Sequence, residues 1–246
     1  MPRIIAVAYG LIAYVIFLAT ILYAIGFVGD FGVPKGVDGG RPAPLAEAFV
    51  VNMALLFVFA TQHSVMARPS FKRWWTQFVP KPIERSTYVI FASLTLLLLF
   101  WQWRPMTQVF WSVTSPVPVA LVWAVFGAGW AVVFLSTFLI NHFDLFGLKQ
   151  VWAYRRRQGV PEARFATPLF YQVVRHPLYL GFIIAFWATP TMTIGHLLFA
   201  TVTTTYILFA IRLEERDLIN AFGGVYVAYR KRTPMLLPMP RRPESA

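Results

Sequence analysis

The chain of 246 residues contains no cysteine, and that absence excludes several kinds of chemistry. Without cysteine there is no disulfide framework, no thiolate metal site and no cysteine nucleophile. Charge is scarce as well, because Asp, Glu, Lys and Arg make up 13% of the residues, against about 25% in an average soluble domain. Ten acidic and 22 basic residues are too few to cover a globule of this size with water-binding surface. The composition therefore argues against a soluble enzyme.

Long uncharged stretches account for most of the chain. Hydrophobic residues reach 58%, and the mean hydropathy is +0.60. The formal net charge of +12 is compatible with a nucleic-acid partner by itself, but the charges sit between apolar runs, as they do in membrane proteins. The sequence therefore predicts a membrane protein with no nucleic-acid partner. No grouping of side chains predicts a metal site, and the oligomeric state is not predicted.

Five uncharged runs are candidates for membrane spans, since a span needs about 20 apolar residues. They are residues 4–29, 48–67, 86–103, 105–143 and 176–211. The fourth run begins with three prolines, so its span is predicted over Val119–Ile140. The last run contains Pro190, which interrupts a helix, so it is predicted to form a hairpin of two helices, Leu178–Ala188 and Thr193–Arg212.

The distribution of Lys and Arg supports that hairpin. With six crossings, 19 of the 22 basic residues fall on one side of the membrane, and cytoplasmic loops carry such an excess. Both termini are therefore predicted in the cytoplasm. The predicted fold is an all-α, polytopic transmembrane bundle of about six helices, with the hairpin broken at Pro190. A cytoplasmic amphipathic helix is expected to follow, because apolar residues recur at helical spacing from Leu218 to Tyr229. Residues 1–246 are predicted to form one domain, with spans in 1–140 and a loop, the hairpin and a cap in 141–246.

The ends of the hairpin carry most of the distinctive polar residues. Arg175, His176 and Tyr179 stand where the chain enters it, and Glu214 and Glu215 stand where it leaves. A hairpin brings these cationic, aromatic and acidic groups together at one membrane boundary. No charged residue lies deep in a span, which argues against an ion or proton pathway. Each of these motifs also has a purely structural interpretation. The basic residues before the hairpin could follow the positive-inside rule, and the tyrosines could lie at the membrane interface. The two glutamates could form exposed ion pairs, which contribute little stability.

Taken in order, these motifs resemble the isoprenylcysteine carboxyl methyltransferase superfamily of integral membrane enzymes. The motifs are Arg-His-Pro-x-Tyr-x-Gly at 175–181, Glu-Glu at 214–215, Phe-Gly-x-x-Tyr-x-x-Tyr at 222–229 and Pro-x-x-x-Pro at 234–238. The resemblance covers residues 141–238. Within the superfamily, the stretches 141–152 and 187–193 are similar to the nurim-type branch, and most similar to the bacterial methanethiol S-methyltransferases.

The resemblance implies an S-adenosylmethionine-dependent methyltransferase in a bacterial cytoplasmic membrane, with its cofactor at the cytoplasmic mouth of the last helices. Its implied acceptor is a small thiol, methanethiol, which would become dimethyl sulfide. The cofactor-binding residues implied by position are Gln150, Tyr171, Arg175, His176, Pro177, Leu178, Tyr179, Glu214, Tyr226 and Tyr229, with loop contacts near residues 164–166. Aromatic faces suit a sulfonium, since they attract a cation by about 0.5–2 kcal/mol. Glu214 can accept hydrogen bonds from ribose or the amino group, and Arg175 or His176 can meet the carboxylate.

A thiol acceptor reacts as its thiolate, so a group must take its proton. His142, Asp144 and His176 are the candidate catalytic residues, and the sequence does not rank them. In the carboxyl methyltransferases, an arginine that contacts the substrate lies four residues before the acid. Here that position is Ala210, which favours a small neutral or thiol acceptor.

Three other functions stay open at this point. The chain could methylate a lipid or prenyl-type carboxyl group, or it could be a nurim-like membrane protein without turnover. It could also bind a b-type haem between His63 and His142, although paired histidines deep in two spans are not present. A carboxyl methyltransferase would transfer label from the methyl donor into extracted lipid. A nurim-like protein without turnover would bind no cofactor, and a haem protein would show a visible absorption spectrum.

Overall fold

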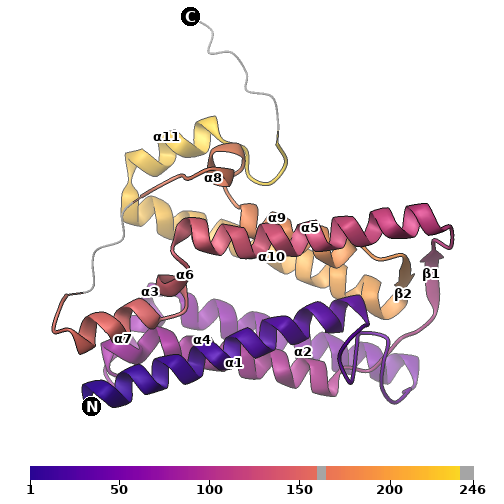
Figure 1. Ribbon diagram of the computed structural model, residues 1–246, viewed down its shortest axis with the longest axis horizontal. Helices are drawn as coiled ribbons and strands as arrows, with labels where there is room; N and C mark the ends of the chain where they lie inside the picture. The colour runs from indigo at the N-terminus through magenta and orange to yellow at the C-terminus, as the bar shows by residue number, and fades with distance from the viewer. Residues whose placement is uncertain (160–164, 239–246) are drawn as a thin grey trace, which may run out of the picture. The chain divides into compact units, whose positions relative to one another are not determined.

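The computed structural model describes residues 1–159 and 165–238, and it confirms the predicted all-α membrane fold (Figure 1). Five helices are long and apolar enough to cross a membrane, and a shorter apolar helix accompanies them. The chain is therefore a multi-pass membrane protein. The five are α1 (Arg3–Gly29), α2 (Leu45–Ala67), α4 (Lys81–Gln102), α5 (Pro116–Ile140) and α10 (Ile194–Phe222). The others are α3 (Pro69–Trp75), α6 (His142–Leu145), α7 (Leu148–Arg155), α8 (Phe170–Val173), α9 (Pro177–Trp187) and α11 (Gly224–Arg232).

The chain divides into two compact units, and each draws on separate parts of the sequence. Unit 1 takes its described residues from 1–113, 141–162 and 191–202. Unit 2 takes its described residues from 114–140, 163–190 and 203–246. The first part of α10 belongs to unit 1 and the rest to unit 2. The assignment of the whole chain to one domain stays a prediction.

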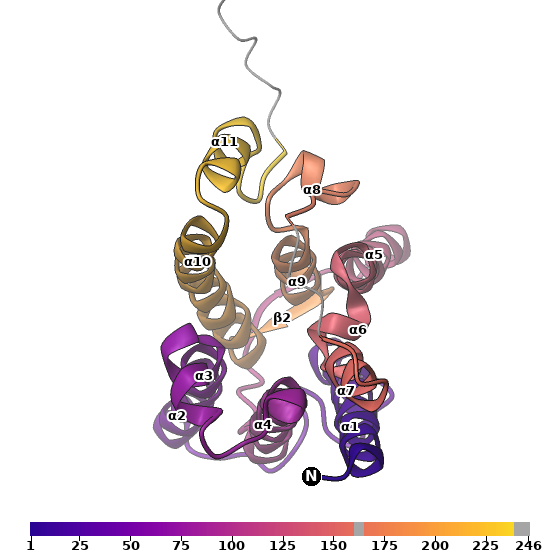
Figure 2. The ribbon, with the colours of Figure 1, turned by 90° about the vertical axis from the view of Figure 1, so that its left-hand side faces the viewer.

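Unit 1 is built on α1, α4 and α2, with α4 packed against both of the others (Figure 2). The helix α7 lies along the beginning of α1, where the side chains of Ala6, Ile83 and Val151 form a buried cluster. Gly10 allows this close approach, because a Cβ atom there would stand 2.8 Å from Cγ2 of Val151. Burial of small and branched side chains thus holds the N-terminal span against α7.

A short strand pair in unit 1 was not anticipated from the sequence. Strand β1 (Val109–Ser112) pairs antiparallel with β2 (Thr191–Thr193), with an irregular register between Val109 and Trp111. Thr193 fixes the end of β2, since its hydroxyl donates to Asp38 Oδ1 at 2.5 Å. Strands of three or four residues give too little alternation to be recognised in an apolar sequence.

In unit 2, α5 and α9 pack face to face through two glycines. A Cβ atom on Gly181 would lie 2.7 Å from the carbonyl oxygen of Gly129, and one on Gly129 would lie 2.7 Å from the backbone nitrogen of Ala185. Small residues of this kind let membrane helices approach through their backbones. Gly181 is the glycine of the Arg-His-Pro-x-Tyr-x-Gly motif, so that motif includes a helix contact as well as polar groups.

The helices α9 and α10 run antiparallel in unit 2, as the predicted hairpin requires. Trp187 at the end of α9 donates its indole N–H to Thr204 Oγ1 at 2.9 Å. At the other end, His176 Nε2 lies 3.1 Å from Glu215 Oε1. Contacts that pair a later residue of one helix with an earlier residue of the other define an antiparallel arrangement. The flanks of the Pro190 bend therefore meet.

Two helix boundaries differ from the prediction. The helix α5 begins at Pro116 and not at Val119, because proline lacks only an N–H that the first turn leaves unpaired anyway. The helix α10 continues to Phe222 and not to Arg212, because its charged residues are good helix formers. It ends at Gly223, whose φ of 56° lies in the left-handed region. The amphipathic segment is divided between α10 and α11 at the two glycines, 223 and 224, which were expected to break or bend it.

Candidate functional site

The segment 171–181 of unit 2 brings the motif residues to the start of α9. After α8, Val174 is extended, and His176 directly precedes the helix. Pro177 occupies the first helical position, where its fixed φ favours a helix start. His176 and Pro177 are buried, and Tyr179 follows with its ring centroid 5.7 Å from that of His176. The local sequence thus turns the chain from an extended strand into the helix within two residues.

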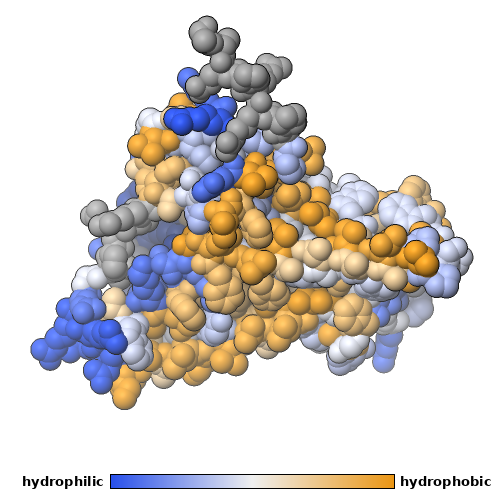
Figure 3. Space-filling model, turned by 45° about the horizontal axis from the view of Figure 1, so that its top comes forward, coloured by the Kyte–Doolittle hydropathy of each residue, from blue (hydrophilic) through white to orange (hydrophobic). Residues whose placement is uncertain are grey.

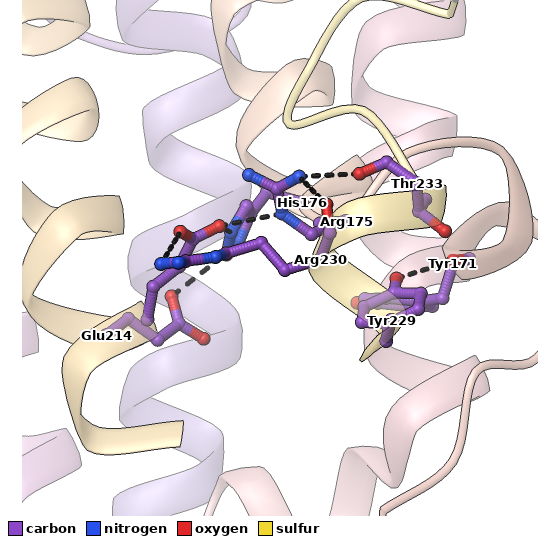
Figure 4. A network of polar contacts seen from close by, with 8 residues as sticks. Tyr171, Arg175, His176, Glu214, Tyr229, Arg230 and Thr233 are labelled. Carbon is purple, nitrogen blue, oxygen red and sulfur yellow. Dashed lines mark hydrogen bonds and ion pairs between the residues drawn. The ribbon is translucent and has the colours of Figure 1, made fainter. Parts of the chain in front are cut away.

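A largely buried ion-pair network joins this segment to the end of α10 (Figure 4). Arg175 Nε donates to Glu215 Oε1 at 2.7 Å, and the two side chains are only 11% and 12% exposed. His176 Nε2 shares the same oxygen at 3.1 Å, while Arg230 Nη1 lies 3.9 Å from Glu215 Oε2. Glu215 is therefore the centre on which three basic side chains converge.

The C-terminal segment is fastened to the same place. The backbone N–H groups of Arg175 and His176 donate to the carbonyl oxygens of Pro234 and Met235, at 2.9 and 3.2 Å. Arg175 Nη1 also donates to the carbonyl oxygens of Arg230 at 3.1 Å and Thr233 at 2.5 Å. We call residues 233–235 the C-terminal strap. The guanidinium of Arg175 thus holds both Glu215 and the strap.

Aromatic rings collect next to this network, on α8, on α11 and at Phe165. Tyr229 donates its hydroxyl hydrogen to the carbonyl oxygen of Tyr171 at 2.5 Å, which ties α11 to α8. The ring of Phe165 lies 5.9 Å from that of Tyr226 and 5.3 Å from that of Tyr229, both edge to face. Phe222 completes the group, with its ring 5.5 Å from Phe165. We call Phe165, Tyr171, Phe222, Tyr226 and Tyr229 the aromatic cluster.

Three buried polar atoms here have no hydrogen-bond partner among the described residues. They are the hydroxyls of Tyr171 and Tyr226 and Oε2 of Glu214. The nearest cation to that carboxylate oxygen is His176, whose Nδ1 is 3.9 Å away. Buried polar groups are almost always hydrogen-bonded, so three unpaired atoms in one place require an explanation. A polar ligand would supply it.

The tyrosines of the cluster stay protonated at physiological pH. Burial raises the pKa of Tyr171 and Tyr226 above the ordinary value, and the carboxylates of Glu214 and Glu215 raise them further. Burial also raises the pKa of Tyr229 to about 12, against the opposing effect of Arg175. Each ring therefore offers a neutral O–H group and an uncharged π face.

The residues fit an S-adenosylmethionine molecule. A sulfonium is attracted to neutral aromatic faces, and the aromatic cluster offers several. The unpaired oxygen of Glu214 accepts hydrogen bonds from a hydroxyl or an ammonium group, and the tyrosine hydroxyls of Tyr171 and Tyr226 can donate or accept. The structure thus holds unsatisfied groups of the kinds that this cofactor requires.

Three predicted site residues lie in unit 1 instead. His142 Nε2 is 2.8 Å from the hydroxyl of Tyr14, and the ring of Phe146 meets it edge to face at 4.9 Å. Gln150 donates from Nε2 to Asp144 Oδ1 at 2.6 Å, and its own Oε1 is buried with no partner among the described residues. Burial lowers the pKa of His142, so its imidazole is neutral near pH 7.

The structure therefore groups the sequence-predicted residues by unit. Unit 2 brings together Tyr171, Arg175, His176, Pro177, Leu178, Tyr179, Glu214, Tyr226 and Tyr229. Unit 1 contains His142, Asp144 and Gln150. The loop contacts predicted near residues 164–166 fall partly outside the described residues, because Arg164 is not described. The functional role of each of these residues stays a prediction. His63, considered above as a haem ligand, hydrogen-bonds Tyr88 at 3.0 Å.

Glu215, Arg230 and Thr233 were not predicted as site residues, whereas Phe165 lies within the loop contacts predicted near residues 164–166. The Glu-Glu pair indicated that an acidic residue at the end of the hairpin belongs to the site. Adjacent helix residues point about 100° apart, however, and the sequence does not say which of the two faces Arg175 and His176. The carbonyl of Thr233 carries no sequence signal at all. These residues are found only by the tertiary contacts.

The chain is similar to several known proteins. The model of the isoprenylcysteine carboxyl methyltransferase family matches residues 130–220. Methanethiol S-methyltransferase 1 of Bradyrhizobium diazoefficiens is 59% identical over 240 residues, which are 97% of this chain and 84% of that protein. Methanethiol S-methyltransferase of Mycobacterium tuberculosis is 56% identical over 242 residues, which are 98% of this chain and 99% of that protein. Nurim of Xenopus laevis is 29% identical over 75% of this chain and 70% of its own length. No solved structure matches the chain.

Proposed function

Because the chain belongs to the isoprenylcysteine carboxyl methyltransferase superfamily, in the group of the methanethiol S-methyltransferases, we propose that it methylates methanethiol to dimethyl sulfide with S-adenosylmethionine. When bound, this donor supplies an electrophilic methyl group on a positively charged sulfonium. The observation that carries the proposal is the set of unpaired buried atoms of Tyr171, Tyr226 and Glu214 beside the aromatic cluster.

Each side chain near the donor has a distinct task in this proposal. The rings of Tyr226 and Tyr229 would serve the sulfonium of a bound donor, because a neutral π system attracts a cation without holding it as strongly as a carboxylate would. The unpaired Glu214 Oε2 would accept hydrogen bonds from the ribose or the amino group, and Tyr171 would donate its hydroxyl hydrogen to the donor. Tyr179, Leu178 and Pro177 would form the wall at the start of α9.

Arg175 and Glu215 act on the site through other residues. The guanidinium of Arg175 already donates to Glu215 and to the carbonyl oxygens of Arg230 and Thr233. Its proposed task is therefore to hold α11 in place. With α11 fixed, Tyr226 and Tyr229 keep their orientation. Correct alignment of reactants is worth up to about 7–11 kcal/mol in such reactions, and an ion pair that fixes an aromatic wall contributes to it.

The thiol proton has three proposed acceptors, His142, Asp144 and His176. Glu215 accepts the hydrogen bond from His176 Nε2, so a neutral His176 keeps its lone pair on Nδ1. That nitrogen lies 3.9 Å from the unpaired oxygen of Glu214. This geometry supports His176 as the group that takes the proton in unit 2, while Asp144 is occupied by Gln150. The assignment of Gln150 to the donor stays a prediction from the resemblance, and its buried Oε1 is free of partners among the described residues.

The proposal extends to the membrane arrangement. The short helix α9 has 11 residues, or about 16 Å at 1.5 Å per residue, and with the Pro190 bend we count it as one of six crossings. The excess of Lys and Arg then supports a cytoplasmic location for both termini, in a bacterial cytoplasmic membrane. The position of Ala210, four residues before Glu214, supports an acceptor without a carboxylate.

The decisive experiment measures product and cofactor binding separately. Cells that express the chain and receive methanethiol should release dimethyl sulfide into the headspace. In calorimetry with S-adenosylmethionine, Glu214→Ala should bind at least a hundredfold more weakly, because the oxygen that meets the ligand is gone. The matched control is Glu47→Ala, which removes an acid that is half exposed and 3.9 Å from Arg104.

Each result has a defined meaning. Wild-type binding by Glu214→Ala would remove Glu214 from the site. Label from the methyl donor that appears in extracted lipid and not in volatile product would favour a carboxyl methyltransferase. An absence of cofactor binding by the unmodified chain would favour a nurim-like protein without turnover.

A further inference from the structure

A cleft of about 280 Å³ in unit 1 lies between the first turns of α1 and the end of α7. Its lining consists of Ile4, Val7, Trp152, Arg155 and Arg156. Ile4 and Val7 are three residues apart on α1, so they share one face of that helix. Trp152, Arg155 and Arg156 have the i, i+3, i+4 spacing that places them together at the end of α7, where Arg156 is the residue that follows the helix. The cleft thus combines an apolar floor with two guanidinium groups.

The walls of this cleft are fixed by contacts within unit 1. Gly10 on α1 meets Val151 on α7 closely, as described above. Tyr154 donates its hydroxyl hydrogen to the carbonyl oxygen of Met1 at 3.0 Å, and the guanidinium of Arg3 stands over the Tyr154 ring at 5.8 Å. The guanidinium of Arg156 stands over the Trp152 ring at 5.3 Å. The cleft is therefore a formed feature between two packed helices.

The two guanidinium groups in the lining are exposed and lack an acidic partner in the described parts of the chain. The ion pairs recorded there involve Arg104, Arg175, His176 and Arg230, and neither Arg155 nor Arg156. Hydrophilic side chains gather at the lower left of Figure 3, where Figure 1 places the end of α7, and hydrophobic side chains adjoin them. Ile4 is 70% exposed at the start of a membrane-spanning helix. Two unpaired positive charges therefore border an apolar surface at a membrane boundary.

We propose that this cleft binds the headgroup of an acidic phospholipid. The phosphodiester oxygens accept hydrogen bonds from Arg155 and Arg156, whose planar guanidinium groups suit a phosphate. The first carbons of the lipid lie on Ile4, Val7 and the ring of Trp152. A free phosphate would leave that apolar floor unused, and a zwitterionic headgroup would bring a cation against the two arginines. Charge and shape together therefore select an anionic lipid.

The test compares two lipids with identical acyl chains, phosphatidylglycerol and phosphatidylcholine, titrated into the purified full chain in neutral detergent and followed by native mass spectrometry. The unmodified chain should bind one phosphatidylglycerol molecule in preference to phosphatidylcholine. In Arg155→Gln/Arg156→Gln this preference should fall by about thirtyfold, since each basic residue near a lipid surface contributes about 1 kcal/mol. The matched control is Arg73→Gln/Lys81→Gln, which removes two exposed charges from the same unit away from the cleft lining and should change the affinity by less than twofold.

Several outcomes would overturn the proposal. An equal loss in the control pair would mean that net charge, and not the cleft, attracts the lipid. Equal competition by soluble glycerol 3-phosphate would mean an anion site without a lipid. Unchanged phosphatidylglycerol binding by Ile4→Asn would mean that the apolar floor takes no part. Arg155→Lys/Arg156→Lys keeps the charge, so if the glutamine pair unfolds, this variant should still show a several-fold loss, and wild-type affinity in it would contradict the guanidinium contacts. None of these measurements requires methyl transfer.

Discussion

Two polar segments follow membrane helices in this protein, and they reach their final geometry in different ways. In segment 141–150 of unit 1, the polar residues pair within the segment, since Asn141 accepts from the backbone of Asp144 and Gln150 donates to Asp144. The rings of His142 and Phe146 contact Tyr14 and Phe17, which come earlier in the chain, on α1. In segment 171–181 of unit 2, Arg175 and His176 find their partners 39 to 59 residues later, on α10, α11 and the strap.

The charges of the two segments differ as well. Segment 141–150 places a histidine among aromatic rings of α1 and α6–α7. Segment 171–181 places a largely buried ion pair beside unpaired polar atoms. The comparison teaches that the first segment is completed by a helix that precedes it in the chain, whereas the second is completed only by residues that follow the hairpin.

Glu215→Ala should disrupt the second segment more than any other single change. It leaves the largely buried side chains of Arg175 and His176 without their acceptor, and breaking a buried pair in this way costs about 3–5 kcal/mol of unfolding free energy. Glu215→Gln should lose less, because an amide oxygen still accepts one hydrogen bond. Unfolding of the detergent-solubilised chain measures both. The control is Glu47→Ala, whose exposed pair contributes at most about 1 kcal/mol, and equal losses in the two alanine variants would refute the central role of Glu215.

Gly181→Ala should weaken the same segment from its helical end. The added methyl would stand 2.7 Å from a backbone oxygen and 2.9 Å from a backbone nitrogen on α5, so the helices must separate, at a cost of about 1–3 kcal/mol.

Gly127→Ala provides the matched control on α5. No described atom lies within 4 Å of the added methyl there, so this variant should be neutral or stabilised by up to about 1 kcal/mol. Thermal unfolding midpoints of the two variants decide the matter, and a stable Gly181→Ala protein would mean that the α5–α9 contact is not close in solution.

The first segment should make the stability of the folded chain depend on pH through His142. We expect this effect to be the smallest of those predicted here. Burial lowers the pKa of His142 in the folded chain, while the unfolded chain titrates near its ordinary value of about 6.5. As the pH falls through that value, the unfolded state takes up a proton that folded His142 resists, so stability is present above it and declines below it. Between pH 7.5 and 5.5 the unfolding free energy should therefore fall more steeply in the unmodified chain than in His142→Gln. Identical slopes for the two proteins would contradict the burial of a neutral His142.

The spans were predictable because each depends on a long apolar run, which a sequence displays directly. The hairpin was predictable from Pro190 and from the charge distribution. The sequence could not show which distant residues pair with one another. Arg175 was expected to meet a cofactor carboxylate, whereas in the structure its side chain donates to Glu215 and to backbone carbonyl oxygens. A carbonyl oxygen looks the same at every position of a sequence, so such contacts leave no trace in it.

Element ends were less predictable than element identities. Pro116 and Pro118 resemble loop residues in a sequence, yet a first helical turn accepts both. Arg212 to Asp217 resemble the end of a span, yet α10 continues through them to Gly223 because water-exposed charged residues do not stop a helix. Charge marks where a span leaves the membrane, and a glycine in the left-handed region marks where the helix stops.

The C-terminal strap has a consequence for shortened forms of the chain. The backbone N–H groups of Arg175 and His176 donate to the carbonyl oxygens of residues 234 and 235, and the five long apolar helices of the described residues all end before these positions. A chain that stops at residue 232 would therefore retain each of those helices, yet it would lose the bonds that join the start of α9 to the C-terminal segment.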